Sequence, residues 1–248
     1  MAQFKNHFSD GGADYAAYRP TYPPALTDYL AGLVPRRGLA WECGCGSGQL
    51  TLLLAGRFDR VIATDASADQ LAHAPAQPKV EYRCATAESS GLPDGVADLA
   101  ISAQAAHWFD LPAYYAEVRR VARPGAIVAM VTYGLTVIDQ KIDAVVGHFY
   151  ANVVGPYWPP ERIHVEQGYR SLPFPFEELE APPLELRAEW PLAGLIGYIE
   201  TWSAVRAMAK AEGRARIESF RGELADAWGP EANVRTIRWP LSLRVGWV

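Results

Sequence analysis

The sequence predicts an α/β fold: a doubly wound, mostly parallel sheet that carries an α-helical cap. Short apolar runs alternate with helical patterns over five units in the first half of the chain, and short connections join them. Three glycines at alternate positions follow the first apolar run. After Gly134 the alternation stops, and aromatic helical segments follow. These observations predict an α/β core up to residue 134 and a cap after it.

Each strand of the predicted core is an apolar run bounded by polar or turn residues. The expected strands are residues 39–43, 60–64, 80–84, 96–102 and 126–132. The expected helices are residues 25–33, 49–58, 67–73 and 111–121, with Ser67 as the N-cap of the third. Right-handed crossovers bring the carboxyl ends of parallel strands to one edge of a sheet. A ligand site is therefore expected at that edge.

The second half of the chain predicts the cap and the last strands. Helices are expected at residues 136–153, 161–169, 196–211 and 215–228, and a strand at 184–190. Residues 234–248 predict either a final strand pair or one long bent strand. The expected division is an N-terminal lid and first helix (1–36), the core (37–134), the cap (135–182 and 195–230), and C-terminal strands that complete the sheet (183–194 and 231–248).

Composition excludes several classes of protein. The net charge of −5 and the absence of Lys/Arg runs argue against a nucleic-acid partner. The N-terminus lacks the apolar region of a signal peptide, and no apolar stretch is long enough to cross a membrane. Three cysteines fit a reducing compartment, and Cys43 and Cys45 alone make a poor metal site. We expect a soluble cytoplasmic protein without a metal, as a monomer or homodimer.

The turn after the first strand predicts a nucleotide-type ligand. Gly44, Gly46 and Gly48 remove side chains at alternate positions, so that the backbone can approach a ligand and aim free N–H groups at it. Gln49 stands where the dinucleotide-binding GxGxxG pattern needs its third glycine, and the lysine of a P-loop is missing. The turn therefore argues against both of these phosphate-binding motifs.

Two carboxylates at strand ends refine the ligand. Asp65 ends the second strand, 65 − 48 = 17 residues beyond the last glycine, where it can accept hydrogen bonds from two ribose hydroxyls. NAD-dependent enzymes share this geometry, so Asp65 predicts an adenosine-containing ligand and no more. Glu42 would repel a pyrophosphate but suits a cation. An acid that complements the helix dipole is the structural alternative for Glu42.

The run Glu42, Gly44, Gly46, Gly48 resembles the first motif of class I S-adenosylmethionine (SAM) dependent methyltransferases, whose fold is Rossmann-like. Ala87, Glu88, Leu92 and Pro93 match the loop after the third strand in that family. Residues 104–110 resemble the type 11 and trans-aconitate groups of small-molecule methyltransferases, and Tyr15, Tyr18, Arg19, Pro20 and Tyr22 resemble their N-terminal lid. The resemblance is specific over residues 8–133 and looser beyond.

The resemblance implies SAM as cofactor and methyl transfer to a small molecule, with O-methylation of a hydroxyl or carboxylate expected. The residues it implies for the cofactor are Tyr18, Arg19, Glu42, Gly44, Cys45, Gly46, Gly48, Asp65, Ala66, Ala87, Glu88 and Gln104. A hydroxyl acceptor needs a base, for which His107 is the candidate, although a packed structural histidine is the alternative. A carboxylate acceptor needs none.

The acceptor pocket is expected among aromatic residues, because such pockets are mostly apolar with a few polar groups. Its candidate lining residues are Tyr22, Trp108, Tyr157, Trp158 and Trp202. Candidate anchors for an acidic acceptor are Arg162, His164 and Arg206. Two other functions stay open at this point: an NAD-dependent oxidoreductase, and a SAM-binding sensor or partner subunit without catalysis.

Overall fold

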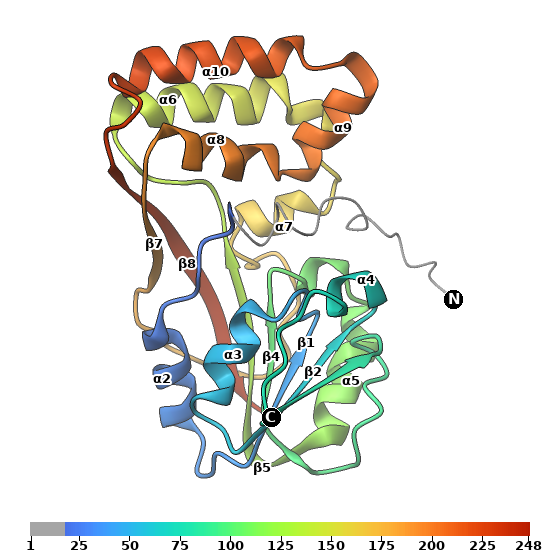
Figure 1. Cartoon of the computed structure of the whole chain (residues 1–248). Coiled ribbons are helices and arrows are strands. Elements are labelled where there is room, and N and C mark those ends of the chain that lie inside the picture. Colours follow the sequence, from blue (N-terminus) through green and yellow to red (C-terminus); the bar gives the residue numbers. More distant parts are fainter. Residues whose placement is uncertain (1–17) are drawn as a thin grey trace.

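The computed structural model describes residues 18–248 and shows a layered sheet domain with a group of helices beyond one of its edges (Figure 1). Within this part of the chain the main sheet has the strand order β3-β2-β1-β4-β5-β8-β6, and β7 pairs with β8 outside that order. The strands are β1 (Leu39–Cys43), β2 (Arg60–Asp65), β3 (Val80–Cys84), β4 (Ala97–Ala103), β5 (Ala122–Tyr133), β6 (Glu177–Leu179), β7 (Glu185–Trp190) and β8 (Arg235–Trp247). Strands β1 to β5 are parallel, and β8 is antiparallel to β5.

Helices cover both faces of the parallel strands. The core helices are α2 (Pro24–Leu33), α3 (Gln49–Ala55), α4 (Ala68–Leu71) and α5 (Leu111–Val121). Alternation along β1 separates the faces: Ala40 belongs to the apolar cluster that includes α2 and α3, whereas Trp41 belongs to the cluster of α5. All five residues of β1 are buried, as expected for a central parallel strand. This is the Rossmann-like architecture that the sequence predicts.

The cap lies beyond the carboxyl ends of the parallel strands and is joined to the sheet by β7 and β8 (Figure 1). Its helices are α6 (Gln140–His148), α7 (Arg162–Glu166), α8 (Leu192–Glu200), α9 (Ser203–Glu212) and α10 (Ala215–Trp228), with a π-helical turn at Phe149–Val153 and 3-10 turns at Gly155–Tyr157 and, in the core, Ala106–Trp108. Phe149 stacks on Phe220 of α10 with ring centroids 3.9 Å apart. Helix α7 lies between this group and the sheet (Figure 1).

The last segment is one long strand, which is one of the two predicted alternatives. The first half of β8, Arg235–Pro240, pairs with β7, and the second half, Leu241–Trp247, pairs with β5. Its end also pairs with β6. The same strand is thus part of both the main sheet and the connection to the cap.

Several predicted element boundaries are wrong. The helix expected at 196–211 is two helices, because Trp202 takes an extended backbone conformation that buries its indole. The helix expected at 136–153 begins at Gln140 and changes to a π-helix at Phe149. The helix expected at 161–169 ends at Glu166, before two residues with positive φ.

The expected division of the chain also differs in two places. Residues 177–179, expected in the cap, form β6 in the main sheet, and residues 192–194, expected among the strands, begin α8. Tyr15 of the expected lid lies outside the described residues. No helix in residues 18–248 is long and apolar enough to cross a membrane.

Candidate active site

The glycine turn after β1 has the backbone conformation that requires glycine. Gly44, Gly46 and Gly48 have φ values of +68°, +55° and +83°. A Cβ atom on Gly44 would lie 2.5 Å from Ala105 Cβ, and one on Gly48 would lie 2.6 Å from the Tyr82 hydroxyl. These two glycines are needed for packing within the protein.

Gly46 differs from its neighbours because it faces open space. A Cβ atom there would meet nothing closer than Gln70 Oε1 at 3.8 Å. The N–H groups of Gly44 and Cys45 donate to the Thr64 carbonyl, and that of Gly46 donates to Asp65 Oδ2 at 2.8 Å. The prediction that these N–H groups are free for a ligand is therefore wrong. At Gly46, unlike at Gly44 and Gly48, the missing side chain leaves room beside the turn.

Asp65 lies at the end of β2 with its carboxylate held toward this turn. Its Oδ1 accepts from the Ser67 N–H at 2.8 Å while Oδ2 accepts from Gly46. Each oxygen keeps a further lone pair that can accept from a ribose hydroxyl. The side chain is half-buried, and this burial raises the pKa of Asp65. The structure fixes the acid in place before any ligand binds.

Glu42 is a buried carboxylate at the end of β1, only 2% exposed. Its Oε2 accepts a hydrogen bond from Thr51 Oγ1 of α3 at 2.5 Å. Burial, together with the charge of Asp65, raises the pKa of Glu42 to about 8. A cation bound beside Glu42 would stabilise its ionised form.

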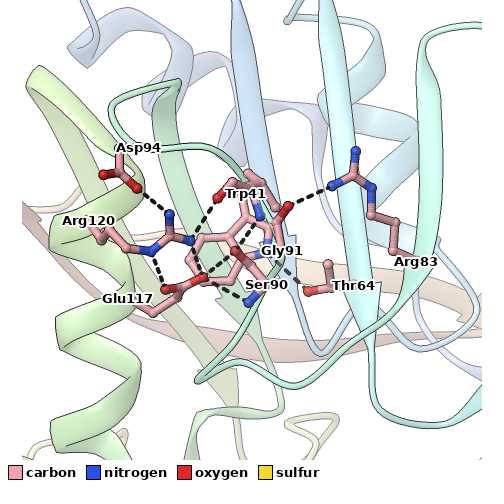
Figure 2. A network of polar contacts seen from close by, with 9 residues as sticks. Trp41, Thr64, Arg83, Ser90, Gly91, Asp94, Glu117 and Arg120 are labelled. Carbon is pink, nitrogen blue, oxygen red and sulfur yellow. Dashed lines mark hydrogen bonds and ion pairs between the residues drawn. The ribbon is translucent and has the colours of Figure 1, made fainter.

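The loop after β3 carries Ala87 and Glu88 at the tip of a turn closed by a bridge between Thr86 and Ser89. Glu88 Oε1 accepts from the backbone N–H of Asp110, the N-cap of α5, at 3.0 Å. Figure 2 shows that the next part of the loop is held by a polar network on α5, where Glu117 binds Ser90 and Arg120 binds the Leu92 carbonyl. The loop is therefore attached to α5 at two points.

Gln104 and Tyr169 are the non-glycine residues with positive φ in the described part of the chain, at 58° and 62°. Gln104 Oε1 accepts from Thr132 Oγ1 at 2.8 Å, and its Nε2 donates to the Tyr133 carbonyl at 2.9 Å. The Tyr169 hydroxyl lies 2.8 Å from His107 Nδ1. Unusual backbone conformations of this kind gather at functional sites. Both residues lie where the ends of β4 and β5 meet α7.

His107 differs from the base that the sequence suggested. Burial, helped by the nearby charges of Arg162 and His164, lowers its pKa to about 3. Its ring also lies 4.7 Å from that of Trp108. The imidazole is therefore neutral at physiological pH and only weakly basic.

Comparison with known proteins identifies the family. A family model described as a methyltransferase domain matches residues 41–130. A methyltransferase of Dictyostelium discoideum is 34% identical over 230 residues, which cover 91% of this chain and 88% of that protein. The chain belongs to the class I SAM-dependent methyltransferases. This membership replaces the alternative of an NAD-dependent oxidoreductase.

A solved structure described as a type II methyltransferase from Anaeromyxobacter dehalogenans shares the whole architecture. It is 50% identical, has a TM-score of 0.88, and covers 93% of this chain and 98% of that one. A malonyl-[acyl-carrier protein] O-methyltransferase of Geobacter sulfurreducens is 32% identical over 145 residues, 52% of each chain. The likeness to this O-methyltransferase thus covers about half of each protein.

The residues at the strand ends of the methyltransferase fit SAM. The open face of Gly46 is a cradle that any side chain would fill, and Asp65 has lone pairs available for a ribose. The buried Glu42 matches the positive charges of SAM, directly or through water. Ala66 follows the end of β2 and Ala87 lies in the loop after β3, both with small side chains. When bound, SAM supplies a methyl group already activated for transfer.

The N-terminal residues expected at the cofactor lie at the junction of core and cap. Arg19 Nη1 donates to the Tyr133 hydroxyl at 3.4 Å, and its guanidinium carbon lies 5.5 Å from the ring centre of Tyr198 on α8. Tyr18 lies against Gly197 of the same helix, with 38% of its surface exposed. Tyr22 is buried and makes an edge contact with Tyr133.

Three of the aromatic residues expected at the acceptor lie in the cap, where they divide into two groups. Trp158 and Trp202 contact one another and Tyr150, with Trp202 buried. Tyr157, in contrast, donates its hydroxyl to Glu212 on α9. The Tyr157 hydroxyl is therefore bound within the cap, whereas the two tryptophans pack against each other.

Arg162 is the basic residue that joins this aromatic group. Its guanidinium carbon lies 4.7 Å from the ring centre of Trp158, and Nε donates to the Tyr150 hydroxyl at 2.7 Å. Among residues 18–248, no carboxylate lies within the 4.0 Å of an ion pair with Arg162. His164 bonds to the Ser171 hydroxyl, and Arg206 is half-buried on α9.

The three cysteines of this methyltransferase are free thiols, with Cys43 and Cys45 buried and Cys84 exposed. No group of three or more histidine, cysteine or acidic side chains in residues 18–248 could hold a metal ion. Burial raises the pKa values of the Cys43 and Cys45 thiols. These side chains are unreactive packing groups.

Sequence reasoning missed the residues that hold the site in shape. Thr51 stands nine residues after Glu42, where α3 returns beside β1, and no local motif marks it. Tyr169 ends the segment expected to be a cap helix, and no motif marks it as a partner of His107. Glu117 and Arg120 have the i, i+3 spacing of a helical ion pair, which is a signal that could have been used.

Proposed function

We propose that this methyltransferase transfers the methyl group of SAM to an oxygen of a small-molecule acceptor, with an ionised carboxylate favoured over a hydroxyl. The observation that carries the choice is the lowered pKa of His107, about 3, beside Tyr169. A general base works best when its pKa is near the operating pH. A hydroxyl acceptor would lack such a base at His107, whereas a carboxylate is already ionised.

The reaction then needs only positioning. A lone pair of the carboxylate oxygen forms the new O–CH₃ bond, the electrons of the S–CH₃ bond return to sulfur, and S-adenosylhomocysteine leaves. The negative and positive charges cancel, and no proton moves. The protein's contribution is to hold oxygen and methyl group in line and exclude water, the kind of catalysis that orientation provides.

Arg162 is the proposed anchor of the acceptor. A guanidinium suits a carboxylate because it can donate two parallel hydrogen bonds. Its position between Tyr150 and Trp158 also provides apolar surface for the rest of a small molecule. The O-methylation named for the Geobacter relative supports the same chemistry without indicating the same substrate.

The test is a panel assay in which the protein is incubated with SAM and aliphatic or aromatic carboxylic acids, phenols, alcohols and amines. We expect S-adenosylhomocysteine together with a product that has gained one methyl group and that alkali hydrolyses, as it does an ester. Products only from amines, or only alkali-stable ethers, would contradict the proposal. If SAM binds but no acceptor gives S-adenosylhomocysteine above the spontaneous rate, a non-catalytic SAM-binding role is favoured instead.

A further inference from the structure

We propose that Glu117 is a positioning residue for the nucleobase half of SAM, acting through the loop of residues 86–92. The inference concerns the cofactor alone and does not depend on the acceptor. Glu117 lies on α5 and is buried. The loop that it holds begins after β3, beside Asp65 at the end of β2. The loop thus begins beside the proposed ribose site, and it carries Ala87 and Glu88, two of the residues proposed for the cofactor.

The contacts of Glu117 define the loop's path. Its Oε1 accepts from both the N–H, at 2.8 Å, and the hydroxyl of Ser90. The Ser90 hydroxyl in turn accepts from the Leu92 N–H at 3.1 Å. One carboxylate therefore fixes two residues of the loop, directly and through a relay (Figure 2).

Arg120 completes the network from the next turn of α5. It donates to Glu117 through Nε at 2.8 Å and Nη2 at 2.7 Å, and Nη2 also reaches the Leu92 carbonyl at 2.8 Å. Its Nη1 pairs with Asp94 beyond the loop. Figure 2 shows these contacts converging on one point of α5. The hydrogen bonds of Glu117 and Arg120 involve charged, partly buried groups, and such bonds are stronger than those between neutral groups.

The burial of the loop explains why its path matters for the ligand. Ser90 and Leu92 are almost fully buried, and Ala87 lies in the apolar cluster of α5. Because Ala87 and Glu88 occupy the turn immediately before Ser90, a shift of Ser90 moves both of them. The hydrogen bonds of Glu117 go to Ser90 and Arg120, neither of which is proposed to contact SAM, so we expect its effect on binding to pass through the loop.

The experiment compares Glu117→Gln with the wild type by calorimetric binding of S-adenosylhomocysteine and of S-inosylhomocysteine, which differs only in the base. We expect about tenfold weaker binding of S-adenosylhomocysteine, on the scale of one lost charged hydrogen bond. We also expect a smaller ratio between the two affinities, because the base is no longer held in one place. A purely structural role would lower the melting temperature and leave this ratio unchanged.

The matched control is Glu178→Gln, which removes a carboxylate on β6, at the opposite end of the strand order from β3, with the same two-point contact to an arginine, Arg244. It should change neither affinity. Ser90→Ala removes only one hydroxyl and serves if Glu117→Gln does not fold; we expect it to weaken S-adenosylhomocysteine binding about threefold with the same loss of base discrimination. Folded variants with wild-type affinity and wild-type base discrimination would overturn the proposal.

Discussion

The core and the cap hold the residues proposed for the cofactor and for the acceptor by different means. In the core, backbone geometry does most of the work: positive φ angles shape the glycine turn, and backbone N–H groups orient Asp65. In the cap, contacts between side chains dominate, as where Arg162 lies against Trp158 and Tyr150. Backbone geometry suits a cofactor that does not vary, whereas side chains can change with the acceptor. Substitutions in the two regions should therefore affect different ligands.

The largest effect is expected from filling the cradle at Gly46. Gly46→Ala, and more strongly Gly46→Val, should weaken SAM binding about 100-fold or more, because the added atoms occupy ligand space and the positive φ is strained. Calorimetric binding measures this loss. Gly95→Ala is the control, since Gly95 also has positive φ and open space but lies before β4, at the opposite edge. Wild-type affinity in Gly46→Ala would show that the turn does not face the ligand.

Asp65→Ala should weaken SAM binding by about 2 to 3 kcal/mol, because ribose hydroxyls and the Gly46 N–H lose their acceptor. Calorimetric binding measures this loss. Steady-state kinetics should show little change in the acceptor KM. Equal SAM affinity in the variant and the wild type would exclude a ribose contact.

Arg162→Ala tests the cap. We expect acceptor KM to rise about tenfold, from the loss of a charged hydrogen bond, while the Kd for SAM stays unchanged. Steady-state kinetics with the acceptor found by the panel assay measure the first quantity, and calorimetry the second. Arg170→Ala, which removes an exposed arginine of the same segment, should change neither. A rise in the Kd for SAM would place Arg162 on the cofactor instead.

Glu42 should make SAM binding depend on pH. Because the pKa of Glu42 is about 8 in the free protein and a cation favours the ionised form, binding should tighten by up to about tenfold per pH unit between pH 6 and 8. Proton release on binding, measured by calorimetry in several buffers, should approach one below pH 8. Glu42→Gln should remove both effects. If SAM binding to the wild type did not depend on pH, Glu42 would not interact with the charges of SAM.

The same group affects the stability of the ligand-free protein. The raised pKa means that the folded state keeps the Glu42 proton to higher pH than the unfolded state does. The contribution of Glu42 to the free energy of unfolding is therefore fully present below its ordinary pKa and is lost as pH rises toward about 8. Glu42→Gln should flatten this part of the stability profile.

The smallest effect is expected at His107. Since its pKa is about 3, kcat should not titrate with a pKa of 6 to 7, and His107→Ala should lower turnover less than about tenfold. The Kd for SAM should stay the same. The opposite result would be a wild-type kcat that falls with an apparent pKa near 6.5 and a variant in which this pH dependence is lost. It would show that His107 is the base.

The core strands could be predicted from sequence because buried parallel strands are short apolar runs between turn residues. The boundaries of β1 and β3 are those expected, and β4 differs by one residue at each end. The boundaries of the cap helices were harder to predict, because the break at Trp202 depends on the burial of its indole among other aromatic rings. That energy comes from tertiary packing, which no local pattern contains.

The site divides in the same way. The positive φ angles of Gly44 and Gly46 and the position of Asp65 at a strand end could be predicted, because turn conformation and strand ends are local features of the sequence. The partnership of His107 with Tyr169 joins residues 62 positions apart, and the lowered pKa of His107 arises from burial in the folded protein. The role of a titratable side chain such as His107 therefore could not be predicted without the structure around it.

The final strand has a consequence for the order in which the molecule is assembled. Strand β8 comes after every cap helix in the chain, yet it lies between β5 and β6 in the main sheet. On the ribosome, the nucleotide-binding half must wait with the edge of β5 uncovered until the entire cap has been synthesised. An edge left open in this way invites pairing with other chains, so a premature stop within the cap should yield aggregates instead of a smaller working enzyme.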